Sequence, residues 1–202
     1  SVSSAGDVNG DGYDDVIVGE PEYFNSPSPG NAYIFFGGVA MNNISDVTLT
    51  GEAVNDYFGR SVSSAGDVNS DGFDDVITGA RGPGSGRGKA YIFYGGINMN
   101  NTADVIMIGE AIDNYFGTSV SSAGDLNGDG FSDVIIGADY ASITGKAYVF
   151  FGGAAMNNIV DVTLTGEAVN NYFGHSVSST GDVNGDGFDD VIVGAYQYSS
   201  NT

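Results

Sequence analysis

The chain has 202 residues, with 26 Asp and Glu against five Lys and Arg, which gives a formal net charge of −21. Phosphate binding needs clustered Lys and Arg, so nucleic acid and anionic membrane surfaces are excluded as expected partners. The lack of Cys excludes a disulfide framework and thiolate metal sites. The sequence contains no run of 18 apolar residues, so we expect no membrane insertion.

The composition is that of a folded chain with many turns. Aromatic residues make up 12%, which a disordered chain of this acidity would lack, and 33 residues are Gly. So much Gly favours tight turns between short strands over long helices. The chain begins at Ser1 without a recognisable signal peptide, and we expect a mature product or a fragment of a longer protein.

A repeat runs through the whole chain. A nine-residue Asp-rich string occurs four times, with successive starts 60, 58 and 57 residues apart, at Asp7–Asp15, Asp67–Asp75, Asp125–Asp133 and Asp182–Asp190. We predict four short strands in each period. The first is the SVSSAG-like segment before the string. The second is the DVIVG-like segment that begins at the last Asp of the string. The third is AYIFF or a close variant, followed by Gly-Gly, and the fourth is VTLT or VIMI.

These strands predict an all-β fold. The second strand is β-branched and almost continuously apolar, which is typical of a strand buried on both faces. VTLT alternates apolar and polar residues and so suits an outer strand with one wet face. Four strands in each period of about 60 residues predict a β-propeller of four-stranded blades. A β-solenoid competes, but its repeats are usually shorter. We place the blades at about 1–52, 53–110, 111–167 and 168–202, the last one incomplete, within a single propeller segment.

Each Asp-rich string carries side-chain oxygens at its positions 1, 3, 5 and 9. Calcium takes six to eight oxygen ligands, Gly at position 6 permits a sharp turn, and the carbonyl at position 7 can supply a further oxygen. Position 8 is Asp, Asp, Ser and Asp in the four copies, and position 4 is Gly except for Ser70, so these positions are interpreted as bystanders. An EF-hand is excluded because position 12 lies inside a strand and is not Glu.

A plain turn is the alternative, because Asp, Asn and Gly are ordinary turn residues. Four copies favour a cation, since the three carboxylates of each string would otherwise repel one another. We predict up to four Ca²⁺, one for each string, and regard Mg²⁺ as less suited because it prefers a rigid octahedron. The predicted ligands are Asp7, Asn9, Asp11, Tyr13 and Asp15; Asp67, Asn69, Asp71, Phe73 and Asp75; Asp125, Asn127, Asp129, Phe131 and Asp133; and Asp182, Asn184, Asp186, Phe188 and Asp190.

Two further dipeptides keep step with the strings. Phe-Gly stands at 58–59, 116–117 and 173–174, and Gly-Ala at 79–80, 137–138 and 194–195. With the Asp-rich strings, they make the chain resemble FG-GAP repeats, the blades of the integrin α-subunit propeller. The resemblance implies a seven-bladed ring, calcium in the loop between the first two strands of a blade, and adhesion or ligand recognition outside the cell or on its surface. Blade one departs from it with Gly19-Glu20 in place of Gly-Ala.

The connections between the second and third strands differ most among the copies. In the resembling fold they lie on the face opposite the calcium loops, and variable loops on a fixed scaffold often bind ligands. The alternative is that these loops are simply unconstrained. For a protein or glycan ligand, the contacts that we expect first are Tyr23, Phe24, Arg81, Arg87, Tyr140, Tyr196 and Tyr198.

We expect no enzyme activity. His175 is the single His and stands where other repeats have Arg60 and Thr118, so it is predicted to face solvent in a loop. Asp-rich strings that recur in every blade fit a structural role better than one active site. Three functions remain open: an adhesion or lectin-like module, a structural repeat of a surface fibre or array, and an accessory propeller of a larger secreted enzyme. Three and a half blades require either a longer chain or self-association to close a ring.

Overall fold

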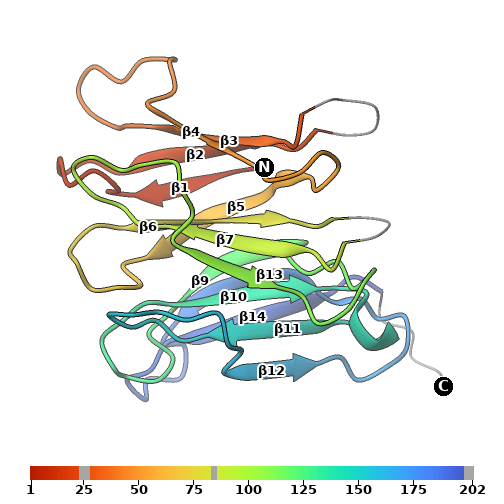
Figure 1. Ribbon diagram of the computed structural model, residues 1–202. Helices are drawn as coiled ribbons and strands as arrows, with labels where there is room; N and C mark the ends of the chain where they lie inside the picture. Colours follow the sequence, from red (N-terminus) through yellow and green to blue (C-terminus); the bar gives the residue numbers. More distant parts are fainter. Residues whose placement is uncertain (23–27, 83–85, 198–202) are drawn as a thin grey trace.

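The computed structural model describes residues 1–22, 28–82 and 86–197. It contains three antiparallel sheets of four strands, each in sequence order, and one sheet of two strands, which confirms the predicted all-β fold of blades (Figure 1). The first blade consists of β1 (Val2–Gly6), β2 (Asp15–Glu20), β3 (Asn31–Phe35) and β4 (Val47–Thr50). The second consists of β5 (Phe58–Gly66), β6 (Asp75–Ala80), β7 (Lys89–Phe93) and β8 (Val105–Ile108). The third consists of β9 (Ser119–Gly124), β10 (Asp133–Ala138), β11 (Lys146–Phe150) and β12 (Val162–Thr165). The separate two-stranded sheet, called the half-blade, consists of β13 (Phe173–Gly181) and β14 (Asp190–Ala195).

The blades pack face to face in chain order, and the first strands β1, β5, β9 and β13 contact one another in succession. Because neighbouring strands are antiparallel, the two ends of each blade carry different loops. The connections after the first strands lie at one end, on the left in Figure 1, and those after the second strands lie at the other. The Asp-rich strings and the variable loops are therefore on opposite ends of the molecule.

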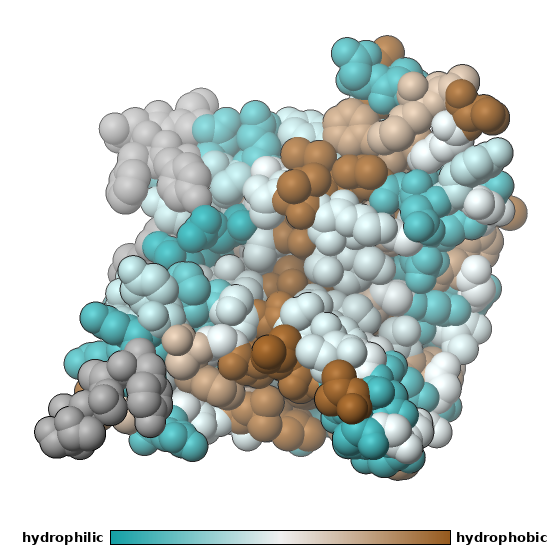
Figure 2. Space-filling model, turned by 180° about the vertical axis from the view of Figure 1, so that it is seen from behind, coloured by the Kyte–Doolittle hydropathy of each residue, from teal (hydrophilic) through white to brown (hydrophobic). Residues whose placement is uncertain are grey.

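The core lies between blades, and each of its hydrophobic clusters combines residues of two successive blades. Ile17, Ile77 and Ile135 occupy the same position in β2, β6 and β10, and all three are 0% exposed. Their counterpart in β14, Ile192, is 59% exposed, because the other three pack against the following blade and no blade follows β14 in the described residues. Figure 2 shows that other hydrophobic residues at the surface form a band with hydrophilic residues on both sides.

The Phe-Gly pairs join each blade to the one before it. Phe116 is buried, and its ring contacts Tyr148 and Phe150 of its own blade at centroid distances of 5.5 and 6.2 Å. Gly117 has a left-handed φ of 84°, and a Cβ atom there would overlap the carbonyl oxygen of Lys89 in the preceding blade. Only Gly therefore allows the two backbones to approach this closely.

Polar contacts also repeat at each interface between neighbouring blades, which we call a seam. The Ser61 hydroxyl donates to the Gly117 carbonyl at 3.0 Å, and the Ser119 hydroxyl donates to the Gly174 carbonyl at 2.9 Å. Lys146 forms an ion pair with Glu110 at 2.8 Å. The strands are accompanied by a short 3₁₀ turn, η1 (Ala141–Ile143), and no helix in the described part of the chain has the length and apolarity to cross a membrane.

Candidate functional site

The four Asp-rich loops share one hydrogen-bond network, which the first loop illustrates. The two carboxylate oxygens of Asp7, at position 1, accept bonds from the backbone N–H groups of Asp11 at 3.0 Å and Gly12 at 2.9 Å. The amide oxygen of Asn9 also accepts from the Asp11 N–H, at 2.8 Å, and the Asp11 carboxylate accepts from the Tyr13 N–H at 3.0 Å. The same bonds recur in the other three loops with lengths of 2.8 to 3.1 Å. The oxygens at positions 1, 3 and 5 are therefore brought together at each loop tip.

Position 9 is the buried anchor of the loop. Asp15, Asp75 and Asp133 are at most 1% exposed. One oxygen of Asp75 accepts from the Val68 N–H at 2.9 Å, and the other accepts from the Gly95 N–H at the end of the third strand at 2.8 Å. Burial raises the pKa of Asp75 to about 7 and that of Asp133 to about 6. The carboxylates at positions 5 and 1 contribute to both rises in pKa, so positions 1, 5 and 9 sense one another's charge.

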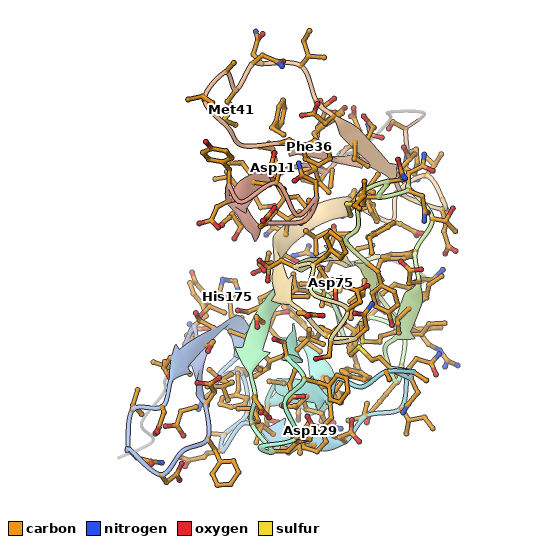
Figure 3. The ribbon with its side chains drawn as sticks, turned by 90° about the vertical axis from the view of Figure 1, so that its left-hand side faces the viewer. Asp11, Phe36, Met41, Asp75, Asp129 and His175 are labelled. Atoms are coloured by element: carbon orange, nitrogen blue, oxygen red, sulfur yellow. The ribbon has the colours of Figure 1, made fainter. Side chains whose placement is uncertain are left out.

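The donor set of each loop is made entirely of oxygen, which suits a hard cation. In the described residues no three His, Asp or Glu side chains are arranged so that they alone could hold a metal ion. A cation at the loop would therefore also need the Asn oxygen at position 3 and the carbonyl at position 7. Figure 3 looks onto this end, where the labelled Asp11, Asp75 and Asp129 lie in three successive blades.

The opposite end holds a cavity of about 340 Å³ lined by Arg81, Asp139, Tyr140, Tyr172, His175, Tyr196 and Gln197. Three of the seven predicted ligand contacts, namely Arg81, Tyr140 and Tyr196, thus lie around one cavity. The rings of Tyr140 and Tyr172 are 5.0 Å apart, and those of Tyr172 and Tyr196 are 6.2 Å apart. A hydrogen bond with Tyr172 raises the pKa of Tyr140. The Arg81 guanidinium lies 4.5 Å from the centre of the Tyr115 ring, within cation–π range.

Sequence reasoning missed Asp139, Tyr172 and Gln197 in this cavity, and its placement of His175 in a solvent-facing loop was wrong. Asp139 is 4% exposed, and its carboxylate is 2.9 Å from the His175 ring nitrogen Nδ1. His175 lies in strand β13 and keeps 46% of its side chain exposed, so it faces both solvent and Asp139. One signal could have found Asp139: it directly follows Gly-Ala, as do Arg81 and Tyr196 in their blades. Equivalent positions of neighbouring blades meet at the same end.

The remaining predicted contacts lie elsewhere. Arg87 lines a separate cavity of about 190 Å³ together with Asp56 and Lys89. Tyr23, Phe24 and Tyr198 fall outside the described residues.

Comparison with known proteins agrees with this architecture. The FG-GAP repeat model matches residues 1–35, 58–93, 116–150 and 173–202. Integrin alpha-5 of Xenopus laevis is 33% identical over 212 residues, which cover 96% of this chain and 19% of that protein. Integrin alpha-6 of Homo sapiens is 31% identical over 162 residues, covering 79% of this chain and 14% of that protein. Integrin alpha pat-2 of Caenorhabditis elegans is 30% identical over 219 residues, covering 96% and 18%.

The chain spans less than a fifth of the length of these relatives. The matched segments contain the Asp-rich strings and the Phe-Gly pairs that form the contacts between blades. The chain therefore belongs to the FG-GAP repeat family and is homologous to integrin alpha subunits over most of its length.

Proposed function

We propose that this protein is a calcium-binding β-propeller module that works outside the cell or at its surface and recognises a protein or glycan ligand. It acts by binding and has no catalytic role of its own. Each of its four Asp-rich loops takes one Ca²⁺, which fixes the loop end of the blades. The opposite end presents the ligand-binding cavity. The homology to integrin alpha subunits supports the cell-surface setting.

The observation that carries the calcium proposal is the surplus of charge in each loop. A plain turn also needs hydrogen-bond acceptors at positions 1, 5 and 9. Backbone N–H groups use both carboxylate oxygens at positions 1 and 9, but at position 5 they use only one oxygen, which a neutral Asn would supply equally well. All four loops instead place Asp at these positions, close enough that the charges at positions 1 and 5 raise the pKa of Asp15, Asp75 and Asp133. A bound divalent cation removes this repulsion, which supports a cation site over a turn alone.

Isothermal titration calorimetry on chelator-treated protein tests this proposal by counting binding events. We expect up to four Ca²⁺ to bind, and Asp11→Ala to remove one of them by eliminating the position 5 ligand of the first loop. Asp14→Ala is the matched control, because it removes one carboxylate from position 8 of the same loop and should leave the number of bound ions unchanged. Equal stoichiometry in wild type and Asp11→Ala would contradict the proposed site.

The ligand-binding half of the proposal has its own test. Tyr140 in the cavity and Tyr13 in the first Asp-rich loop are both 47% exposed, but they lie at opposite ends of the molecule. Among hits on a glycan or extracellular-protein array, we expect Tyr140→Ala to abolish binding and Tyr13→Ala to preserve it. Binding that survives Tyr140→Ala and is lost in Tyr13→Ala would place the ligand at the other end and contradict the proposal.

A further inference from the structure

Position 8 of the Asp-rich loops, interpreted above as a bystander, contacts the loop of the preceding blade. The backbone N–H of Asp74 donates to the Asp7 carbonyl at 3.2 Å, and the Asp74 carboxylate accepts from the Asp7 N–H at 2.8 Å. Asp189 makes the same two bonds to Asp125, at 3.0 and 2.8 Å. In both cases position 8 of one loop makes two hydrogen bonds to the backbone of position 1 in the preceding loop.

A glycine in the preceding blade leaves room for this contact because it has no side chain. Gly6 and Gly124 directly precede position 1 and have left-handed φ values of 74° and 70°. A Cβ atom on either would overlap the side chain of Asp74 or Asp189. A second contact accompanies the first: a Cβ atom on Gly10, at position 4, would lie 2.5 Å from the Phe73 ring. Each such seam therefore joins two loops through two side chains.

The seam between blades two and three differs at both points. Ser132 takes the place of the position 8 carboxylate and keeps the N–H bond to the Asp67 carbonyl, at 3.1 Å, but has no carboxylate to offer the Asp67 N–H. Ser70 takes the place of the glycine that the ring packs against in the first seam. Ser70 and Ser132 therefore both lie at the seam between blades two and three, although they are 62 residues apart in the sequence (132 − 70).

Position 8 also lies between two predicted ligands of its own loop. Asp74 follows Phe73, whose carbonyl is a candidate ligand, and precedes Asp75. A cation that orders this segment of the second loop thereby orders Asp74, and Asp74 holds the first ligand of the first loop. From this geometry we infer that Asp74 and Asp189 are positioning residues that couple calcium binding in pairs, loop one with loop two and loop three with loop four, while Ser132 leaves loops two and three weakly coupled. This inference rests on the proposed calcium sites.

The four position 6 glycines offer one probe for each loop. The N–H groups of Gly12, Gly72, Gly130 and Gly187 each donate to the position 1 carboxylate of their own loop at 2.9 Å. Their NMR signals, followed during titration of the chelator-treated chain with Ca²⁺, give four separate midpoints. Asp74→Ser is the first variant to test, because Ser132 shows that the fold accepts Ser at this position.

We expect Asp74→Ser to raise the Ca²⁺ midpoints at both Gly12 and Gly72 by about 5-fold, since coupling between two sites is reciprocal. The midpoints at Gly130 and Gly187 stay unchanged. Asp189→Ser should raise the Ca²⁺ midpoints at Gly130 and Gly187 and leave those at Gly12 and Gly72 unchanged. Ser132→Asp should lower the midpoints at Gly72 and Gly130. Asp74→Asn keeps an acceptor oxygen and should restore most of the coupling. Asp14→Ser is the charge control, because Asp14 holds position 8 in the first blade and no loop precedes it within this chain.

Three results would overturn the inference, and they separate it from the calcium proposal. If all four signals respond to Ca²⁺ but Asp74→Ser leaves Gly12 unchanged, the coupling is wrong while the calcium sites stand. If all four midpoints shift together, or if Asp14→Ser and Asp74→Ser shift Gly12 equally, the effect is general electrostatics and not a contact between two loops. If no glycine responds in the wild-type chain, the calcium proposal and the coupling both fail.

Discussion

Gly137 of β10 lies against the carbonyl oxygen of Gly174 in the next blade, so closely that a Cβ atom on Gly137 would overlap it. The same relationship joins Gly19 to Gly59 and Gly79 to Gly117. Three seams between blades therefore depend on the absence of a side chain at the fifth residue of each second strand. In the half-blade, the three described atoms nearest to a Cβ atom on the corresponding Gly194 all belong to Ser176.

This difference gives a matched pair of substitutions. Gly137→Ala forces two backbones apart and should lower the free energy of unfolding by about 1–3 kcal/mol, the usual range for overpacking. Gly194→Ala places its methyl group against a Ser hydroxyl only and should have less than half that effect. Urea denaturation of both variants in saturating Ca²⁺ checks the prediction. Equal destabilisation would show that the contact across the seam is unimportant.

The buried isoleucines of the third strands should carry much of the stability. Ile92 in β7 is 0% exposed, whereas Ile97, in the connection that follows, is 80% exposed. Ile92→Ala should cost about 2–5 kcal/mol in unfolding free energy because it leaves a cavity. Ile97→Ala, the same chemical change in the same blade, should stay within about 0.5 kcal/mol. Urea denaturation of the two variants checks this, and a large effect of Ile97→Ala would mean that its surface is covered.

The ion pair between Lys146 and Glu110 predicts a pH dependence. The hydrogen bond from Lys146 lowers the pKa of Glu110 below its usual 4.5, so the folded state holds this proton less tightly than the unfolded state does. The stabilisation is therefore present above pH 4.5 and is lost as the pH falls through the lower folded-state value. Half of the Glu110 side chain is exposed, so the contribution is less than about 1 kcal/mol.

Replacing Lys146 isolates this contribution. The difference in unfolding free energy between wild type and Lys146→Gln should be largest near neutral pH, shrink below pH 4.5, and fall further in high salt. Denaturant titrations at several pH values measure it directly. A difference that stays constant down to pH 2 would contradict the electrostatic origin of the effect.

The repeat made most of the fold predictable. An alternation of short apolar runs and turn residues in register over four copies leaves few arrangements other than blades, and the Asp-rich strings identified the loops. Contacts between blades could not be foreseen in the same way. Nothing in the sequence indicates that Ser70 and Ser132 belong to one seam, since their proximity depends on how adjacent sheets pack.

The cavity was predictable only in part. Arg81, Tyr140 and Tyr196 stood out because their loops vary, but Asp139 looked like one more acid in an acidic chain. Its significance comes from burial and from its contact with His175, which joins residues 36 positions apart. The exposure of Ile192 likewise reflects the lack of a following blade in the described residues and not the local sequence, which matches that of the buried strands.

The most direct test of the central claim is the melting temperature of chelator-treated protein as Ca²⁺ is added, with Mg²⁺ as the control. Ligand linkage predicts that each filled site adds about 2.7 kcal/mol when Ca²⁺ is at 100 times its dissociation constant, so the melting temperature should keep rising with Ca²⁺ concentration and respond much less to Mg²⁺. A melting temperature that is the same with chelator, Ca²⁺ and Mg²⁺ would show that the Asp-rich loops are ordinary turns and would contradict the account.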